Sequence, residues 1–335
     1  MKIYCNYWEV KLMPLKDRVL AVLEENKGKS VSGSDIAASI GMTRSAVWKA
    51  IKSLREEGYS IYAVTNRGYC LSDESDVLSE PGIRSYLKTE CLGRHCDIFK
   101  TIDSTNTFAK SLAQLGGEHG SIIIAEQQTA GRGRMSRSYY SPGNMGIYMS
   151  VILRPKMSVD YCLMITSCAA VAVAEAIESV CGVKADIKWV NDIYINGKKV
   201  CGILTESAID IEHGGLEYAI LGIGLNVTND SFPKDLENTA TSLYLETGKI
   251  FSRSQIIAEI LNHLETGLAA ISDKSFLDEY RKRSVLVGHR ISITKNDVTE
   301  YAVCEGIDEY GRLVVNMEGT GERRELNSGD VKVAD

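Results

Sequence analysis

The sequence predicts an α+β protein with three consecutive parts: a helical head that ends in a hairpin, a central mixed β-sheet with helices, and a small all-β tail. Two observations predict this order. Helical periodicity broken by glycines dominates residues 15–71, and short apolar strands then alternate with helices. From residue 288 onward the chain shows strand patterns and turn signals. We therefore expect domains at 15–74, 75–272 and 273–335, with a polar, acidic linker at 72–80 and a dispensable extension at 1–14, consistent with a start codon assigned too early.

The composition is that of a globular protein. The 335 residues are 44% hydrophobic and 24% charged. No apolar run reaches the length expected of a membrane span, and Met1–Val10 lacks the apolar core of a secretory signal. Nine cysteines without a Cys-x-x-Cys pair argue for reduced thiols and against a disulfide framework or a zinc site. We expect a cytoplasmic protein with no membrane partner.

Charge is distributed unevenly, although the net charge of −6 gives by itself no hint of nucleic acid. Residues 15–71 carry a net charge of +3, whereas residues 72–335 carry −10. A basic head on an acidic body indicates different partners for the two parts.

The head is predicted to be a winged helix-turn-helix. Its three helices are expected at 15–23, 34–40 and 44–57. Gly41 breaks the chain between the second and third helices, and Thr43 is a candidate N-cap for the third. Strand patterns at 61–64 and 69–71 flank a turn signal, which predicts the hairpin called the wing.

A winged helix of this kind places its third helix in the major groove of DNA. Candidates for phosphate and base contacts are the polar and basic residues of that helix and one arginine of the wing: Thr43, Arg44, Ser45, Trp48, Lys49, Lys52 and Arg67. The alternative is a winged helix used for protein contacts, with its charges solvated. Because a helix-turn-helix normally binds two half-sites, we expect the rest of the chain to dimerise.

The body alternates strands and helices. Strands are predicted at 98–101, 122–125, 146–153, 187–195, 198–204 and 218–227, and helices at 105–115 and 164–180. Ser104 is a candidate N-cap for the first helix, and Asn196-Gly197 is a strong hairpin signal. The second helix is apolar and rich in alanine, so we expect it to be buried against the sheet.

One segment of the body, Gly131–Arg137, combines three arginines with two glycines. We call it the arginine loop. Arginine donates in pairs to phosphate or carboxylate oxygens, and glycine lets the backbone approach a ligand closely. This pattern favours a loop that closes over an anionic small molecule; the alternative is a solvated basic loop. No P-loop motif is present, and Gly222-x-Gly224 lacks the third glycine of a dinucleotide fingerprint, so any ATP site lies outside these classes.

In combination these segments resemble biotin protein ligases. The resemblance is carried by the arginine loop together with 103–106, 188–192, 198–204 and 222–226, and it extends over residues 15 to about 330. The head is similar to that of the members that also repress biotin operons. The tail, with strands at 288–294, 301–307 and 312–316, resembles the small SH3-like β-barrel of the family.

The resemblance implies a reaction. Biotin and ATP give biotinyl-5′-adenylate and pyrophosphate, and the acyl group passes to a lysine of the biotin carboxyl carrier protein, a subunit of acetyl-CoA carboxylase. The adenylate-bound protein then forms a homodimer on operator DNA. Because an anionic carboxylate must attack an anionic phosphate, catalysis is expected to rest on positioning and charge neutralisation.

The same resemblance assigns roles to residues. The catalytic cations are Arg132, Arg134, Lys188 and Lys199. Biotin contacts are expected from Ser104, Thr105, Asn106, Gln128, Arg132, Gly133, Arg134 and Lys199. The nucleotide is expected at Tyr139 and Asn226, with Mg²⁺ at Asp192.

The chain departs from the family pattern at three positions. Ser136 replaces a glycine, Tyr139 replaces a tryptophan expected to stack on the adenylate, and Val190 replaces a proline. None of these changes removes a charge, so we expect activity with altered nucleotide affinity. Two alternatives stay open: a lipoate ligase-like enzyme, and a ligand-sensing repressor without catalysis. The winged head argues against the first and the four cations against the second.

Overall fold

The computed structural model describes residues 13–155, 157–158, 161–210, 215–295 and 298–334. The chain divides into two compact units. The first runs to Leu87 and includes Ser252–Ala258; the second consists of Lys88–Phe251 and Glu259 to the end. The first unit thus contains the predicted head and continues beyond residue 74. Residues 1–12 of the predicted extension lie outside the described part.

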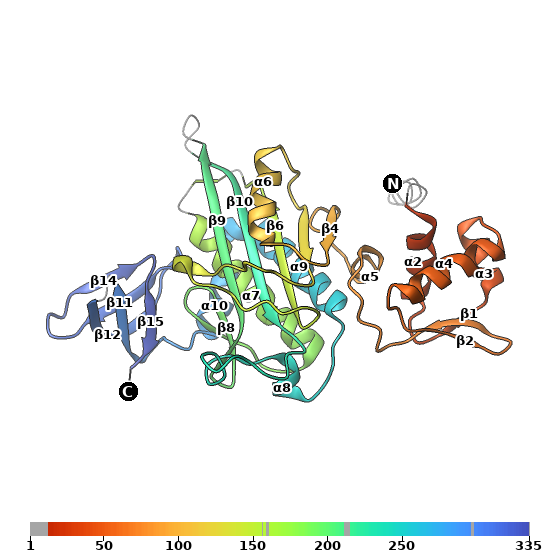
Figure 1. The fold of residues 1–335 in the computed structure, drawn as a ribbon. Coiled ribbons are helices and arrows are strands. Elements are labelled where there is room, and N and C mark those ends of the chain that lie inside the picture. Colours follow the sequence, from red (N-terminus) through yellow and green to blue (C-terminus); the bar gives the residue numbers. More distant parts are fainter. Residues whose placement is uncertain (1–12, 156, 159–160, 211–214, 296–297, 335) are drawn as a thin grey trace. The chain divides into compact units, whose positions relative to one another are not determined.

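The head has the three predicted helices and the hairpin, labelled in Figure 1. The helices are α2 (Leu15–Glu25), α3 (Gly33–Ile40) and α4 (Arg44–Glu56), and the strands β1 (Ser30–Val31), β2 (Ile61–Val64) and β3 (Gly68–Leu71) form an antiparallel sheet in the order β1-β3-β2. Thr43 caps α4, since its hydroxyl accepts the Ala46 amide at 3.2 Å. Apolar side chains at helical spacing, such as Val47, Ile51 and Leu54, form the core.

The segment 72–80, which its polar and acidic composition predicted to be a linker, is partly buried. Leu78 and Ser75 are buried, and a short helix, α5 (Glu80–Arg84), follows. Asp76 accepts hydrogen bonds from Arg253 Nε at 2.6 Å and from the Arg253 amide at 2.9 Å. The role of this segment as a domain boundary stays a prediction, and local composition does not reveal its contact with Arg253, far along the chain.

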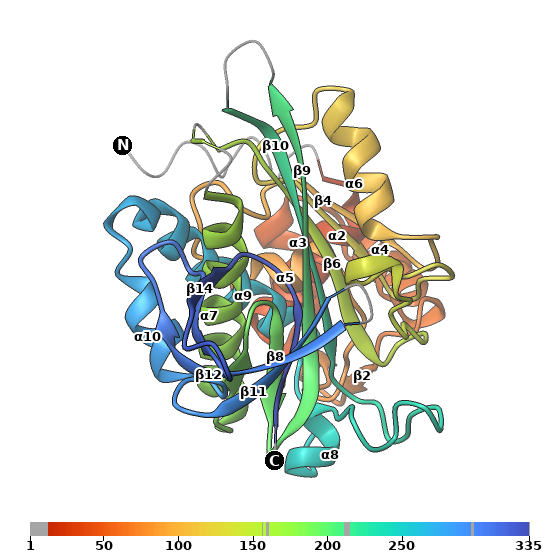
Figure 2. The same cartoon turned by 90° about the vertical axis from the view of Figure 1, so that its left-hand side faces the viewer.

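The body is a seven-stranded mixed sheet in the order β4-β5-β6-β10-β9-β8-β7. Its strands are β4 (Cys96–Phe99), β5 (Ile122–Ala125), β6 (Gly146–Leu153), β7 (Asp186–Lys188), β8 (Asp192–Ile195), β9 (Lys198–Asp210) and β10 (Gly215–Asn226). The pair β4–β5 is parallel and the other pairs are antiparallel. Helices α6 (Thr105–Gln114) and α7 (Cys162–Cys181) cover opposite faces of this sheet, as Figure 2 shows.

Helix α7 corrects one expectation from the sequence. Its 20 residues are long and apolar enough, by length and composition, to cross a membrane, whereas no run of that length was expected. However, 72% of the apolar stretch is buried inside the protein, as in the core helix of a sheet-and-helix layer. Its burial against the sheet is therefore confirmed, and its length was underestimated.

The rest of the second unit contains α8 (Leu243–Thr247), most of α9 (Arg253–Ala269), α10 (Phe276–Lys282) and the tail. The tail is a five-stranded antiparallel sheet in the order β14-β13-β12-β11-β15. The strands are β11 (Arg290–Lys295), β12 (Val298–Ile307), β13 (Leu313–Met317), β14 (Arg323–Leu326) and β15 (Asp330–Val333). The first three were predicted; closure into a barrel stays a prediction.

Candidate functional site

The second unit contains two adjoining cavities at the arginine loop. The large cavity, of about 260 Å³, lies between this loop, the β7–β8 connection, β9, the loop at 232–240 and the start of β15. The structure brings all four predicted cations to its wall, together with a fifth: Arg132, Arg134, Lys188, Lys199 and Arg137. They come from three separate segments of the sequence, which the fold brings together at the wall of one cavity.

The arginine loop has a strained backbone. Met135 and Ser136 have φ values of 54° and 60°, the left-handed region that favours glycine. A Cβ atom at Gly131 would lie 2.6 Å from Ser141 Oγ and 2.7 Å from the Tyr139 carbonyl oxygen, so no larger residue fits there. Ser136 thus adopts the conformation of the glycine that the family pattern has at this position.

Each cation of the loop has an assigned oxygen partner. Arg134 Nη1 donates to Asn191 Oδ1 at 2.9 Å, and Arg132 Nη2 lies 3.4 Å from Glu206 Oε2. Arg137 Nη2 donates to Asp330 Oδ2 at 2.7 Å, which lowers the pKa of Asp330 against the opposing effect of burial. These contacts orient the guanidinium groups along the wall of the large cavity.

The two lysines of the site differ. Burial lowers the pKa of Lys188, and the nearby Asp192 carboxylate only partly opposes this effect. Lys199 Nζ instead forms an ion pair with Asp192 Oδ1 at 2.7 Å. Burial therefore makes the charged form of Lys188 less stable in the folded protein than it is in water. Lys198, at the hairpin tip, is exposed as expected.

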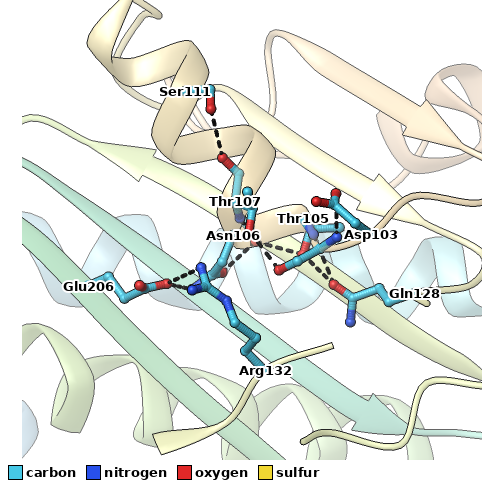
Figure 3. A network of polar contacts seen from close by, with 10 residues as sticks. Asp103, Thr105, Asn106, Thr107, Ser111, Gln128, Arg132 and Glu206 are labelled. Atoms are coloured by element: carbon cyan, nitrogen blue, oxygen red, sulfur yellow. Dashed lines mark hydrogen bonds and ion pairs between the residues drawn. The ribbon is translucent and has the colours of Figure 1, made fainter. Parts of the chain in front are cut away.

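The small cavity, of about 30 Å³, lies beneath the N-terminus of α6 and is lined by five predicted biotin residues: Ser104, Thr105, Asn106, Gln128 and Arg132. Figure 3 shows their network. The Thr105 amide and hydroxyl both donate to Gln128 Oε1, at 2.9 and 3.1 Å. Ser104 caps α6 through the Thr107 amide at 3.4 Å. Apart from Arg132, the polar groups on its wall are uncharged, and Ser104, Thr105 and Asn106 are buried, which suits a neutral polar ligand.

Sequence reasoning missed three glycines that form the floor of the small cavity. Gly202 on β9 pairs with Gly224 on β10. Gly222 lies two residues before Gly224, on the same face of the strand. A Cβ at Gly222 would lie 2.2 Å from Asn106 Oδ1, and one at Gly224 would lie 2.5 Å from the Tyr139 ring. Glycines at alternate positions of a strand often mark a close approach, and this signal could have identified them.

The two predicted nucleotide residues already have partners. Tyr139 lines both cavities, and its hydroxyl donates to the Gly224 carbonyl at 2.6 Å. Asn226 Nδ2 donates to the Thr241 carbonyl at 2.9 Å and so holds the loop beside the large cavity. Their contacts with a nucleotide stay predictions, as does the contact with biotin of Gly133, which lines the large cavity.

Among the residues that the structure describes, no group of three or more metal-ligating side chains occurs. These residues by themselves therefore do not form a metal centre. Asp192 is paired with Lys199, and Asp330 with Arg137. Mg²⁺ needs few protein ligands when phosphates supply the remaining oxygens, so Asp192 fits an ion that arrives with a nucleotide.

In the head, helix α4 has one buried face and one exposed face. Val47, Ile51 and Leu54 are buried, and Trp48 is 55% exposed. All the predicted DNA-contacting residues are exposed: Thr43, Arg44, Ser45, Trp48, Lys49, Lys52 and, in the wing, Arg67. The structure thus leaves these side chains exposed, while their contacts with DNA stay predictions.

Comparisons with known proteins agree with this architecture. The biotin/lipoate A/B protein ligase family matches residues 98–226, and a helix-turn-helix domain matches residues 16–70. The bifunctional ligase/repressor BirA of Bacillus subtilis is 36% identical over 95% of this chain and 98% of its own length. The Escherichia coli protein of the same name is 26% identical over 92% of this chain and 93% of its own.

A solved structure supports the fold of the body and tail. The biotin protein ligase of Aquifex aeolicus, in complex with biotin and ATP, has 26% sequence identity and a TM-score of 0.62. It covers 72% of this chain and all of its own length. With full-length relatives that share head, body and tail, the chain belongs to the family of bifunctional biotin protein ligases and repressors.

Proposed function

We propose that this protein joins biotin and ATP into biotinyl-5′-adenylate and transfers the biotinyl group to a lysine of the biotin carboxyl carrier protein. The observation that carries the proposal is the pair of adjoining cavities: apart from Arg132, which they share, the smaller is lined by uncharged residues, whereas the larger is lined by five cations. A ligand with an uncharged ring and a carboxylate, joined to a nucleotide, matches this division.

The chemistry needs charge neutralisation rather than a protein nucleophile. A carboxylate oxygen of biotin attacks the α-phosphorus, and the bond to pyrophosphate breaks. The amine of the acceptor lysine then attacks the acyl carbon, and AMP leaves with the electron pair of the C–O bond. Arg132, Arg134, Lys188 and Lys199 would stabilise the negative charge that accumulates in the first step. Magnesium would enter as part of MgATP, facing Asp192.

The wall residues support one placement of the two substrates. Thr105, Asn106 and Gln128 would hold the ureido ring of biotin in the small cavity, beside Ser104. The carboxylate would then point past Arg132 towards Lys199. The nucleotide would occupy the large cavity, with Tyr139 and Asn226 near the adenine.

Pyrophosphate exchange tests this function. With purified protein, labelled pyrophosphate should enter ATP when biotin is added, and much more slowly with lipoate. Exchange that depends on lipoate instead would make the enzyme a lipoate ligase. Binding of biotin without any exchange would indicate a ligand-sensing repressor that lacks catalysis.

We further propose that the adenylate-bound protein forms a homodimer that binds operator DNA through α4 and the wing. An unpaired edge of the central sheet supports the proposal of a homodimer. Strand β8 pairs with β9 as far as Gly202, and the Ile203 amide bonds the Asn191 carbonyl. Beyond this point, within the described residues, the outer edge of β9 has no partner strand. Such an edge can pair with a second chain.

A further inference from the structure

Glu206 on β9 is a carboxylate that neither the family pattern nor the charge of the arginine loop had pointed to. Its Oε2 atom accepts a hydrogen bond from Asn106 Nδ2 at 2.8 Å and lies 3.4 Å from Arg132 Nη2. One oxygen therefore contacts both the small cavity and the arginine loop, which are far apart in the sequence. Figure 3 shows the two contacts side by side.

The first contact determines how Asn106 is oriented. An ionised carboxylate only accepts hydrogen bonds, so the amide nitrogen of Asn106 must face Glu206. Its oxygen then faces the Ser150 hydroxyl, which donates at 2.6 Å. Ser150 Oγ also lies 2.8 Å from Thr105 Oγ1. Glu206 and Ser150 thus hold the two ends of the Asn106 amide group, which lines the small cavity.

The second contact determines where Arg132 points. The side chain of Arg132 is 46% exposed and that of Glu206 is 28% exposed. Arg132 lies between Gly131 and Gly133, so its backbone constrains the side chain weakly. The Glu206 carboxylate is the counter-charge that directs this guanidinium to the junction of the two cavities, both of which Arg132 lines.

We propose that Glu206 is a positioning residue for biotin. By holding Asn106 and Arg132 with the same oxygen, it couples the shape of the small cavity to the direction of the loop arginine. Biotin then meets a wall and a cation that are already oriented, which reduces the entropy lost on binding. The inference rests on the proposed function, because it concerns the binding of biotin before adenylation.

The test is Glu206→Gln, which keeps the size of the side chain and removes its charge. A glutamine oxygen in the place of Oε2 can still accept from both donors, but it carries no negative charge to attract and direct the Arg132 guanidinium. We expect the KM for biotin in pyrophosphate exchange to rise about ten-fold, with the KM for ATP and the melting temperature unchanged. The matched control is Glu217→Gln on the neighbouring strand β10, an exposed glutamate that lines neither cavity.

A double-mutant cycle adds a second readout. If Glu206 acts by directing Arg132, then Arg132→Gln should raise the KM for biotin less in the Glu206→Gln background than in the wild type. Additive effects would overturn the coupling. A lower kcat with an unchanged KM, together with a lower melting temperature, would show that Glu206 only stabilises the fold. If the wild-type protein itself catalyses no biotin-dependent exchange, the proposed function fails instead.

Discussion

Arg137 and Asp330 join the arginine loop to the last strand of the tail: the guanidinium Nη2 lies 2.7 Å from the carboxylate Oδ2. The two residues are 193 positions apart in the sequence. The tail therefore contributes directly to the wall of the large cavity, where Gly329 and Val331 flank this carboxylate. This ion pair is a specific contact between the tail and the arginine loop.

Asp330→Asn should weaken closure of the loop over the nucleotide. Arg137 is 66% exposed, so the ion pair contributes only about 0.2–1 kcal/mol. The KM for ATP should therefore rise by up to about five-fold, with little change in the KM for biotin. Steady-state pyrophosphate exchange measures both. Glu318→Gln, which breaks the Arg290–Glu318 pair in the same sheet, is the control. Equal effects of the two variants would contradict a specific role for Asp330.

Arg134→Gly should let the adenylate escape after the first step. The Arg134 guanidinium is oriented by Asn191, and a charge-assisted hydrogen bond contributes roughly 1.5–3 kcal/mol. Loss of the side chain predicts about ten- to hundred-fold weaker retention of the adenylate. Free biotinyl adenylate and biotin on bystander proteins should both rise. Lys198→Ala at the exposed hairpin tip is the control; unchanged labelling by Arg134→Gly would show that Arg134 does not retain the intermediate.

Lys188→Met should make the protein more stable and less active. Burial lowers the pKa of Lys188, so the charged form destabilises the folded protein at pH values below that lowered pKa. This destabilisation fades as the pH rises through the lowered pKa towards the ordinary lysine value. Melting curves at about pH 7 should therefore show an increase of about 1–3 °C, and a smaller one near pH 9.5.

The activity of the same variant separates function from stability. Exchange should fall by at least about ten-fold because a cation is lost from the large cavity. A loss of activity accompanied by a lower melting temperature at neutral pH would instead mean that Lys188 stabilises the fold.

Gly222→Ala should block the binding of biotin. The added methyl group would lie 2.2 Å from Asn106 Oδ1, and Asn106 cannot move without breaking its bonds to Ser150 and Glu206. Isothermal titration should show biotin affinity lowered by at least about ten-fold, equivalent to roughly 1.4 kcal/mol. Gly306→Ala in β12, where a Cβ meets nothing within 4 Å, should bind biotin normally. Normal binding by Gly222→Ala would place biotin elsewhere.

Operator binding should require biotin and ATP together. A head with a net charge of only +3 binds DNA weakly, so two heads must be joined, and the adenylate does this if it binds the dimer more tightly than the monomer. Gel shifts with and without both substrates measure the dependence. Lys49→Ala should also reduce the slope of log affinity against log salt by about one, whereas Lys110→Ala on α6 should not. Equal affinity of the ligand-free protein would refute ligand control.

Local sequence determined most of the elements. Helical spacing and the Thr43 cap predicted α4, and continuous apolar runs predicted β5 and β6 with their observed bounds. The Asn196-Gly197 hairpin is present, and both residues have positive φ values as the turn requires. These features depend on neighbours in the chain, so a single sequence contains the information. Strands β1, β14 and β15 escaped prediction because they are short and mostly polar.

The cations of the site could also be named from the sequence, because arginine, lysine and glycine in one loop already indicate an anion. The oxygen partners of these cations could not be named from the sequence. Glu206 is 74 residues from Arg132, and Asp330 is 193 from Arg137. A carboxylate carries no local mark of the guanidinium that it will meet, since the contact depends on strand register and on how the sheets pack. The sequence by itself indicated which positive charges would gather at one site; only the tertiary structure decided which oxygen orients each arginine of the loop.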